Sequence, residues 1–391
     1  MVQAHKFMKK IKLIRTSTVP GSLNTFCKGL LRELQEQEGY EVVAVSSPGE
    51  QLDEISRREG VKTVAVPMER RISPLNDLKS LWRLIRVFRK EKPAIVHSIT
   101  PKAGLLSMMA AWVARVPVRL HTFTGLVFPT ATGLTQKILI LTDRITCACA
   151  THIVPEGEGV KNDLINYRIT KKPLKVLGHG NIRGIDLEYF NPELPEVQAD
   201  AAKIRKPGVF TFVFIGRLVG DKGINELVEA FERLNTEYPE TRLLLVGRLE
   251  PELDPLKPET IAKIDNNKNI EAVGQQSDVR PWLASADALV FPSYREGFPN
   301  VVIEAGAMGL PSIITDINGS REIIIEGRNG TIVPPRNAMA LEAAMRRFVE
   351  SPGDVARMAE KARPLIASRY EQAYVRRCLK EYYKEILSNR I

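Results

Sequence analysis

The chain has 391 residues, of which 44% are hydrophobic and 26% charged, and it carries a formal net charge of +10. A chain of this length exceeds the usual size of a single hydrophobic core, so we expect two domains. No apolar run reaches the roughly 18 residues that a membrane-spanning helix needs, and the amino terminus lacks the pattern of a secretory signal. We therefore expect a globular, cytoplasmic protein rather than a membrane-embedded or secreted one.

The positive charge is concentrated in the first half of the chain. Residues 1–186 contain 29 Lys and Arg against 16 Asp and Glu, a balance of +13 that leaves −3 for the remainder. A positive surface attracts nucleic acid, anionic membranes or anionic substrates, and composition alone does not choose among them.

Apolar strands alternate with amphipathic helices through this first half. The alternation predicts a mainly parallel sheet that is covered by helices on both faces. The expected strands are Ile11–Arg15, Val42–Ser46, Thr63–Val66, Ala94–Ser98, Val118–Thr122 and His152–Pro155.

A basic helix is predicted between the third and fourth of these strands. Within residues 78–90, Lys79, Arg83, Arg86 and Lys90 recur at steps of four, three and four, as one side of a helix would present them. Two interpretations stay open: an ordinary helix that packs on the core with a solvated basic face, or a helix that docks on an anionic membrane. The opposing apolar stripe consists of Leu78, Leu81, Trp82, Ile85 and Phe88.

The second half repeats the alternation of strands and helices over residues 209–333. A second Rossmann-like domain is therefore expected, and because ligands of open parallel sheets bind beyond the carboxyl ends of the strands, two such sheets facing each other would enclose a cleft. The expected strands are Phe210–Ile215, Arg242–Val246, Ile270–Val273, Ala288–Phe291 and Ser312–Thr315.

A linker separates the two predicted domains. The segment Leu187–Pro195 contains two prolines and shows no periodicity. A helical tail with a plausible apolar stripe follows the second domain. We expect one α/β domain over residues 1–187, a second over residues 188–370 and a terminal helix over residues 371–391.

Two glutamates flank a turn and a helix start directly after the expected strand Ala288–Phe291. In the segment Glu296-Gly-Phe-Pro-Asn-Val-Val-Ile-Glu304, Pro299 suits the beginning of a helix, whose positive end favours a phosphate. Two solvated carboxylates would be the simpler interpretation. However, Glu304 lies among apolar residues, where a charge needs a partner, and ribose hydroxyls could supply one. Hydroxyls beside a diphosphate describe a nucleotide sugar.

The segment Glu296–Glu304 resembles the signature of the retaining glycosyltransferases of family 4, in which seven residues separate two glutamates. Further motifs follow the order and spacing of that family through residues 209–335. They are Phe214-Ile-Gly-Arg-Leu218, Lys222-Gly223, Leu244-Leu-Val-Gly247, Val273-Gly274, Ala286-Asp287 and Phe291-Pro-Ser293. The resemblance implies the GT-B fold, in which two Rossmann-like domains face each other across a cleft and a terminal helix crosses back to the first domain.

The resemblance also implies roles for individual residues of the second domain. Arg217 and Lys222 would bind the diphosphate, Glu304 the ribose and Glu296 the donor sugar. The donor pocket would further include Gly216, the base-facing backbone near Gly274 and Gln275, and the loop residues Gly297, Phe298, Pro299, Asn300 and Val301.

Two positions in the first domain are weaker candidates. Gly21 lies in a segment that reads as a turn after the first strand, where the backbone could approach a ligand, although a simple turn is an equally good interpretation. His121 could contact the donor sugar or shuttle a proton. Many relatives carry histidine immediately before the following glycine, a position occupied here by Thr124. His97, at another strand end, is more typical of a structural histidine.

Motifs of other chemistries are missing or poorly spaced. The glycines of residues 178–184 do not have the spacing of a dinucleotide-binding loop, and we interpret the segment as a domain-closing loop. No phosphate-binding loop ending in Gly-Lys-Ser/Thr and no Asp-x-Asp motif occurs, so an ATPase and a metal-dependent transferase are disfavoured. Reduced thiols without metal-ligand spacing are expected at Cys27, Cys147, Cys149 and Cys378.

The resemblance implies a transferase that moves a hexose or N-acetylhexosamine from a nucleotide diphosphate sugar with retention, and no metal cofactor is expected. Family frequency favours UDP, and GDP stays open. The expected acceptor is a glycan on a polyprenyl diphosphate in bacterial capsule or lipopolysaccharide assembly, with peripheral contact at the inner face of the membrane and no nucleic-acid partner. The alternatives are a non-catalytic binding protein for a nucleotide sugar or nucleic acid, and a sugar-nucleotide epimerase.

Overall fold

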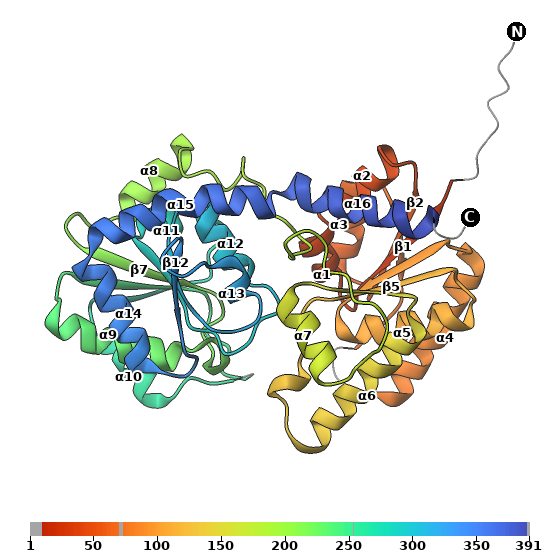
Figure 1. The fold of residues 1–391 in the computed structure, drawn as a ribbon, viewed down its shortest axis with the longest axis horizontal. Coiled ribbons are helices and arrows are strands. Elements are labelled where there is room, and N and C mark those ends of the chain that lie inside the picture. Colours follow the sequence, from red (N-terminus) through yellow and green to blue (C-terminus); the bar gives the residue numbers. More distant parts are fainter. Residues whose placement is uncertain (1–9, 70–72, 253, 389–391) are drawn as a thin grey trace, which may run out of the picture. The chain divides into compact units, whose positions relative to one another are not determined.

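The computed structural model describes residues 10–69, 73–252 and 254–388 (Figure 1). The chain divides into two compact units. Unit 1 comprises the chain up to Glu156, together with Val160–Arg183 and the residues from Val375 onward, and unit 2 comprises Gly157–Gly159 and Gly184–Tyr374.

Unit 1 is built on a six-stranded parallel sheet with the order β3-β2-β1-β4-β5-β6. This is the Rossmann order, in which the first and fourth strands are neighbours. Its strands are β1 (Lys12–Thr16), β2 (Glu41–Ser46), β3 (Lys62–Ala65), β4 (Ile95–Ile99), β5 (Val118–Phe123) and β6 (His152–Pro155). Its helices are α1 (Pro20–Cys27), α2 (Leu30–Glu36), α3 (Glu50–Glu59), α4 (Pro74–Glu91), α5 (Pro101–Val113), η1 (Phe128–Thr130), α6 (Gly133–Cys149), α7 (Glu158–Asn166) and α16 (Gln372–Ser388).

Unit 2 repeats this topology, with the order β12-β11-β10-β7-β8-β9 and all strands parallel. Its strands are β7 (Phe210–Ile215), β8 (Thr241–Val246), β9 (Ile270–Gly274), β10 (Ala288–Phe291), β11 (Ser312–Thr315) and β12 (Gly330–Val333). Its helices are α8 (Pro195–Ile204), η2 (Gly220–Lys222), α9 (Ile224–Glu237), α10 (Pro258–Asn266), α11 (Arg280–Ser285), α12 (Asn300–Ala307), α13 (Ser320–Ile323), α14 (Ala338–Glu350) and α15 (Pro352–Tyr370).

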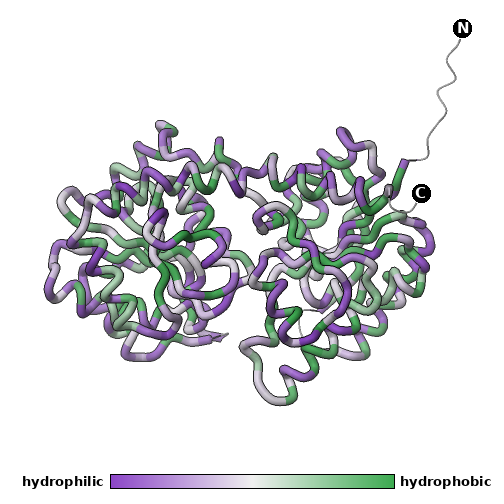
Figure 2. Tube along the Cα trace, in the orientation of Figure 1, coloured by the Kyte–Doolittle hydropathy of each residue, from purple (hydrophilic) through white to green (hydrophobic). Residues whose placement is uncertain are grey.

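The two sheets confirm the predicted fold class. Most strand residues are apolar because helices cover both faces of each sheet, and the green segments of Figure 2 accordingly gather in the strands. Every residue of β8, β10 and β11 is buried. The sixth strand of unit 2, β12, was not among the predicted strands. It has only four residues and begins with Gly330, where a side chain would clash with the carbonyl oxygen of Ser312.

The last helix, α16, completes the core of unit 1. Tyr383 is fully buried, and its hydroxyl lies 3.0 Å from Nη1 of Arg15 and 2.6 Å from Nδ1 of His97. Leu379, Tyr382 and Ile386 lie in the same core cluster. His97 also bonds Thr122 through Nε2 at 2.7 Å. This network supports the structural interpretation of His97.

Helix α5 packs against the sheet so closely that one position requires glycine. A Cβ atom on Gly104 would lie 2.3 Å from Cε1 of His121, far inside van der Waals contact. We expect Gly104→Ala to destabilise unit 1 by about 1–3 kcal/mol, because the buried imidazole has no room to move. Urea denaturation followed by far-UV circular dichroism measures this loss.

Gly353→Ala provides the matched control for this substitution. Gly353 also lies in a helix, α15, and the nearest atom to an added Cβ is the flexible Nη1 of Arg357 at 3.8 Å. The control should unfold at the same urea concentration as the wild type or a higher one. Equal stability of Gly104→Ala and wild type would contradict the close packing of α5.

Candidate functional site

The topology of unit 2 places two loops side by side at the carboxyl ends of β7 and β10. These strands are neighbours in the sheet, yet the connections that follow them lead to opposite edges. Ligands of open α/β sheets bind at such a switch point, outside the carboxyl ends of the strands. The loop after β7 contains Arg217 and Lys222, and the loop after β10 contains Glu296.

Lys222 and Glu296 meet at this switch point. The Lys222 ammonium donates a hydrogen bond to Oε1 of Glu296, and the Ser293 hydroxyl donates to the same oxygen at 2.9 Å. Only 15% of the Lys222 side chain and 18% of the Glu296 side chain are exposed. The partial burial strengthens their interaction and fixes both groups without removing them from solvent.

Glycine residues allow the strand ends to approach each other. Gly223, which follows Lys222, has a φ of 72°, and a Cβ there would lie 2.1 Å from the carbonyl oxygen of Pro292. Gly247 has a φ of 154°, and a Cβ there would lie 1.7 Å from the carbonyl oxygen of Gly216. No other residue type fits this combination of backbone conformation and close contact.

A surface pocket lies over the carboxyl ends of β7, β8 and β9. Glu250 stands in its wall, where its carboxylate accepts hydrogen bonds from Arg217 at 3.1 Å and Arg248 at 2.7 Å. These two hydrogen bonds hold the pKa of Glu250 below its usual value. Because one carboxylate serves two guanidinium groups, the pocket retains positive charge. It is lined by Ile215, Gly216, Arg217, Val246, Gly247, Arg248, Glu250, Gln275, Gln276 and Val279.

Helix α12 begins at the switch point with an uncapped amino end. Its N-cap is Pro299, no side chain caps its first turn, and no acidic residue lies in that turn. The positive dipole end of the helix is therefore not neutralised by an acidic side chain of the first turn and favours an anion. The preceding loop is anchored by Phe298, which is buried and packs edge-on against Tyr370 at 5.6 Å between ring centroids. Glu304 is half-buried in the middle of the helix.

The structure therefore groups most of the predicted site residues of unit 2. Gly216, Arg217 and Gln275 line the pocket directly, and Gly274 precedes Gln275 at the end of β9. Lys222 and Glu296 form a bonded pair, Gly297, Phe298 and Pro299 lead into α12, and Asn300, Val301 and Glu304 lie within the helix.

Gly21 of unit 1 lies in a helix rather than in the predicted turn. Helix α1 already begins at Pro20, so Gly21 belongs to its first turn, and a Cβ there would lie 3.0 Å from the Gln51 side chain. The turn interpretation is wrong at this residue because proline is favourable at the first helical position. The switch point of unit 1 instead brings together Thr18 and Thr100, whose hydroxyls lie 2.9 Å apart.

His121 is enclosed within unit 1. It is 2% exposed, its Nδ1 lies 2.8 Å from the Ser98 hydroxyl, and its ring packs edge-on against Phe123. Burial lowers the pKa of His121 to about 3, so the imidazole is neutral at pH 7. A proton shuttle at neutral pH needs a group that titrates near 7. Thr124, the alternative position, is partly exposed. A contact of either residue with a donor sugar stays a prediction.

The residues of the site that were not predicted include Arg248, Glu250 and Ser293. Arg248 could have been predicted from the sequence, because Gly-Arg-Leu occurs at residues 216–218 and again at residues 247–249, each time directly after a parallel strand. The backbone pairs the two copies, with the Leu218 N–H donating to the Arg248 carbonyl at 2.9 Å. Glu250 and Ser293 act through contacts that the sequence does not display.

Metal-binding clusters and membrane-spanning helices are absent from the part of the chain that the structure describes. Within residues 10–69, 73–252 and 254–388, no group of three or more His, Cys, Asp or Glu side chains is placed to hold a metal ion. No helix in the same ranges is both long and apolar enough to cross a bilayer. Metal independence stays a prediction.

Comparisons with known proteins identify relatives of both halves of the chain. Residues 197–364 match the family "Glycosyl transferases group 1", and residues 21–180 match the "Glycosyl transferase 4-like domain". The chain is 32% identical over 343 residues to the capsular polysaccharide biosynthesis glycosyltransferase CapM of Staphylococcus aureus, a match that covers 88% of each chain. It is 29% identical over 280 residues to the UDP-Gal:alpha-D-GlcNAc-diphosphoundecaprenol alpha-1,3-galactosyltransferase of Escherichia coli, covering 70% of this chain and 71% of the relative.

The fold is similar to that of Anabaena Alr3699/HepE, solved in complex with UDP, with a TM-score of 0.77 and 16% identity over 96% of this chain and 100% of the other. The sequence match to CapM extends through both units, and the two Rossmann-like sheets agree with it. The chain therefore belongs to the group 1 glycosyltransferases of family 4, which are retaining enzymes with the GT-B fold.

Proposed function

We propose that the protein transfers a hexose or N-acetylhexosamine from a UDP-sugar to a lipid-linked glycan, with retention, in the assembly of a bacterial surface polysaccharide. The observation that carries the proposal is the Lys222–Glu296 pair at the switch point of unit 2, beside a pocket with two guanidinium groups. The name of the Escherichia coli relative supports UDP as donor nucleotide and a polyprenyl diphosphate as acceptor carrier. CapM supports the pathway class.

Each site residue has a role in this proposal. Arg217, Lys222 and the amino end of α12 bind the diphosphate, and the Glu304 carboxylate accepts hydrogen bonds from the ribose. Glu296 holds the donor sugar, and the backbone at Gly274 and Gln275 contacts the base. Phosphate binding by cations and a helix amino end is favourable on electrostatic grounds alone.

The proposed reaction breaks the bond between the anomeric carbon and the diphosphate oxygen. A bond from the same carbon to an acceptor hydroxyl oxygen forms on the same face, and the hydroxyl proton passes to the departing phosphate. Negative charge develops on the diphosphate as the bond breaks, so fixed cations at Lys222 and Arg217 stabilise the transition state more than the ground state. Positioning and electrostatics supply most of the rate in this scheme.

The proposed location is the inner face of the cytoplasmic membrane, where nucleotide sugars and lipid-linked acceptors meet. The four cysteines, Cys27, Cys147, Cys149 and Cys378, are free thiols, as expected for a reducing compartment.

A turnover assay separates this proposal from its alternatives. The protein is incubated with UDP-glucose, UDP-galactose or UDP-N-acetylglucosamine and a polyprenyl-diphosphate-linked sugar, and released UDP and lipid product are quantified. We expect UDP and a lengthened lipid product in equal amounts. An unchanged nucleotide sugar that stays bound would indicate a binding protein, and conversion to an epimer without UDP release would indicate an epimerase.

A further inference from the structure

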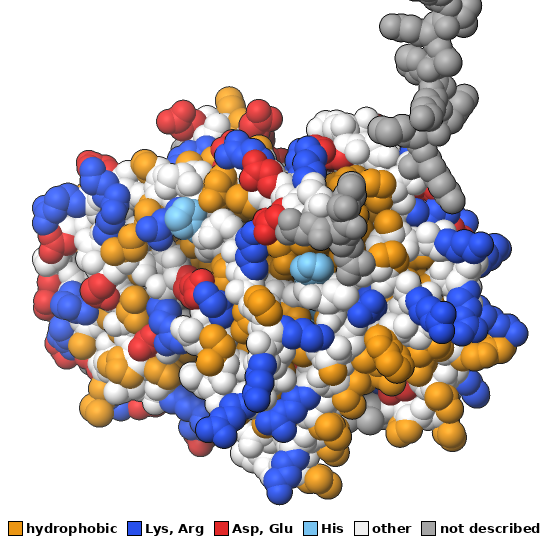
Figure 3. Space-filling model, turned by 45° about the vertical axis from the view of Figure 1, so that its right-hand side comes forward, with side chains coloured by type: hydrophobic (Ala, Val, Ile, Leu, Met, Phe, Trp, Pro, Cys, Tyr) orange, Lys and Arg blue, Asp and Glu red, His pale blue; other side chains and the backbone are white. Residues whose placement is uncertain are grey.

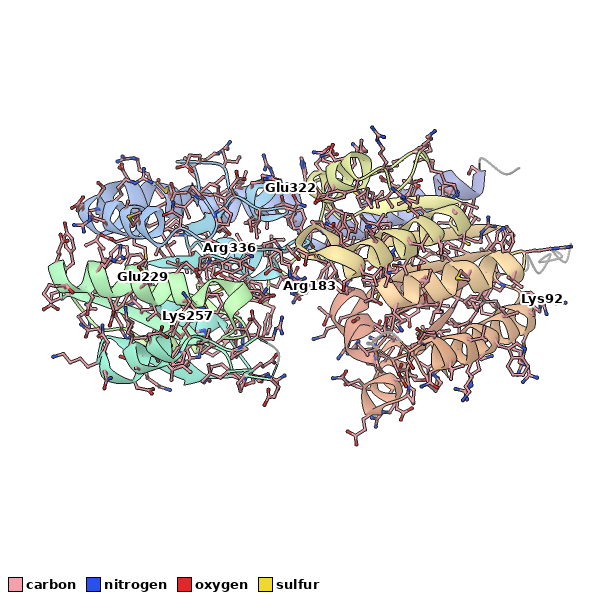
Figure 4. The ribbon with its side chains drawn as sticks, turned by 90° about the horizontal axis from the view of Figure 1, so that it is seen from below. Lys92, Arg183, Glu229, Lys257, Glu322 and Arg336 are labelled. Carbon is pink, nitrogen blue, oxygen red and sulfur yellow. The ribbon has the colours of Figure 1, made fainter. Side chains whose placement is uncertain are left out.

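Three neighbouring helices of unit 1 leave large apolar side chains open to solvent. Helix α5 packs against both α4 and α6, and the three lie side by side in the orange-to-yellow layer of Figures 1 and 4. We name this surface the α4–α6 face. Its exposed apolar residues are Leu75, Leu78 and Trp82 of α4, Trp112 and Val113 of α5, Leu134, Ile138 and Leu141 of α6, and Val127 in the loop before η1.

The exposure is too large to be the edge of an ordinary core-packed helix. Leu75 is 78% exposed, Leu134 72%, Leu78 64% and Trp112 60%. Monomeric proteins expose single apolar residues routinely, but gathered ones mark an interaction surface.

Only part of the predicted apolar stripe of α4 is buried in the core of unit 1. Phe88 is buried in the core together with Leu84, which the stripe did not include, while Leu81 and Ile85 are only partly covered. Leu78 and Trp82 remain exposed in a shallow groove that also contains Lys79 and Arg83. The core therefore uses only part of the apolar surface of α4, and the remainder has no partner within the described chain.

The exposed charges of α4 and α6 are mainly positive, although the exposed Glu69 before α4 accepts a hydrogen bond from Asn76. The two acidic residues of α4 are paired, Asp77 with Lys102 at 2.6 Å and Glu91 with Lys12 and Lys62 at 2.8 and 2.6 Å. Helix α5 contains no acidic residue. The basic side chains on α4 and α6 are Lys79, Arg83, Arg86, Arg89, Lys90, Lys137 and Arg144.

The remaining acidic residue of these helices is only partly ionised near neutral pH. Asp143 of α6 has its pKa raised to about 7 by burial. Figure 3 shows the resulting surface on its right-hand side, where hydrophobic side chains gather among Lys and Arg with few acidic ones. Arg86 extends over the Trp82 ring at 3.2 Å from its centroid, so cation and aromatic ring share one site.

We infer that the α4–α6 face docks on an anionic lipid bilayer. The apolar side chains would enter the boundary between headgroups and acyl chains, and the basic side chains would meet the phosphates. The inference names the surface through which the proposed enzyme reaches a lipid-linked acceptor, and in that sense it rests on the proposed function. Docking itself depends only on the surface and can be measured without turnover.

A second copy of the chain fits this surface less well. In a two-fold symmetric dimer the same patch occupies both sides of the interface. Two α4–α6 faces would then place an excess of like charges opposite each other, which is unfavourable. An anionic bilayer supplies the missing negative charge.

Vesicle sedimentation tests the inference. The full chain is mixed with vesicles of phosphatidylcholine alone or with 30% phosphatidylglycerol, and the bound fraction is measured at low and high salt. We expect binding to the anionic vesicles only, weakened by salt. Trp82→Ser combined with Leu134→Ser should reduce the partition coefficient at least tenfold. Lys79→Gln combined with Arg83→Gln should reduce it by about fivefold per charge removed.

Two exposed apolar residues of unit 2 provide the matched control. Ile261→Ser combined with Met339→Ser removes the same kind of surface, since these residues are 39% and 69% exposed, and it should leave vesicle binding unchanged. Absence of wild-type binding, equal loss in the control, or wild-type binding by the Trp82/Leu134 variant would overturn the inference. Binding of duplex DNA would also overturn the inference if the Lys79/Arg83 variant lost this binding and the Trp82/Leu134 variant kept it.

A parallel titration with UDP keeps the two proposals apart. Docking without UDP binding would contradict the proposed function and leave the docking surface supported. UDP binding without docking would support the nucleotide site and contradict the docking surface. Both variants of the α4–α6 face should bind UDP as the wild type does, because their substitutions lie in unit 1, whereas the proposed nucleotide residues all belong to unit 2.

Discussion

Replacing Glu296 with glutamine is expected to lower kcat about 100- to 1000-fold while the protein stays folded. The amide keeps the shape of the side chain. It removes the negative charge that pairs with the Lys222 ammonium and that strengthens the hydrogen bond from the Ser293 hydroxyl. In the proposed reaction Glu296 also orients the donor sugar, and losing one preorganised electrostatic group at a reaction centre costs about this factor. The measurement is the rate of UDP release at saturating donor, with thermal unfolding as a check on folding.

Glu226→Gln is the matched control for Glu296→Gln. Glu226 of α9 accepts a hydrogen bond at 2.6 Å from Tyr294, which belongs to the loop of Glu296, and no role in donor binding is proposed for Glu226. The control removes the same charge and should keep kcat within a few-fold of the wild type. A wild-type rate in Glu296→Gln, or an equal loss in the control, would remove Glu296 from the site.

Replacing Lys222 with methionine is expected to reduce kcat/KM about 1000-fold. The substitution keeps most of the apolar stem and removes the cation that the proposal places against the departing diphosphate. Weaker binding of UDP should accompany the loss, because the product carries the same diphosphate. Arg295→Met is the comparison, since Arg295 is a more exposed cation in the same loop region, paired with Asp221 at 3.2 Å, and its loss should have little effect.

The double variant of Lys222 and Glu296 distinguishes a shared site from two separate ones. Because the two side chains are bonded to each other, the combined loss should be far smaller than the product of the two single losses. Multiplicative effects would mean that the two groups act independently, contrary to the structure of the pair.

Much of this site was predictable because it follows from the main chain. Parallel strands are buried on both faces, so segments such as Phe210–Ile215 and Ala288–Phe291 are recognisable as short, predominantly apolar runs. Once those strands are assigned, the residues that follow them lie at one edge of the sheet. The proximity of Lys222 and Glu296, 74 residues apart in sequence, is a consequence of that topology.

What could not be predicted depends on side-chain packing. The carboxylate of Glu250 bonds two arginines because successive strand ends approach through Gly216 and Gly247, a contact that no local pattern encodes. Periodicity predicted the helix of residues 78–90 but not how much of its apolar stripe the core would cover. Leu78 is exposed and Phe88 buried in the same stripe, and tertiary packing alone decides between them.

Calorimetric titration of the purified protein with UDP, GDP and ADP in the presence of EDTA tests the central claim most directly. A nucleotide-sugar site in unit 2 predicts that UDP binds without metal and that Glu304→Ala weakens this binding at least about tenfold, because the ribose hydroxyls lose a charged acceptor. Absence of binding by all three nucleotides, or unchanged UDP binding by Glu304→Ala, would contradict the assignment of the site.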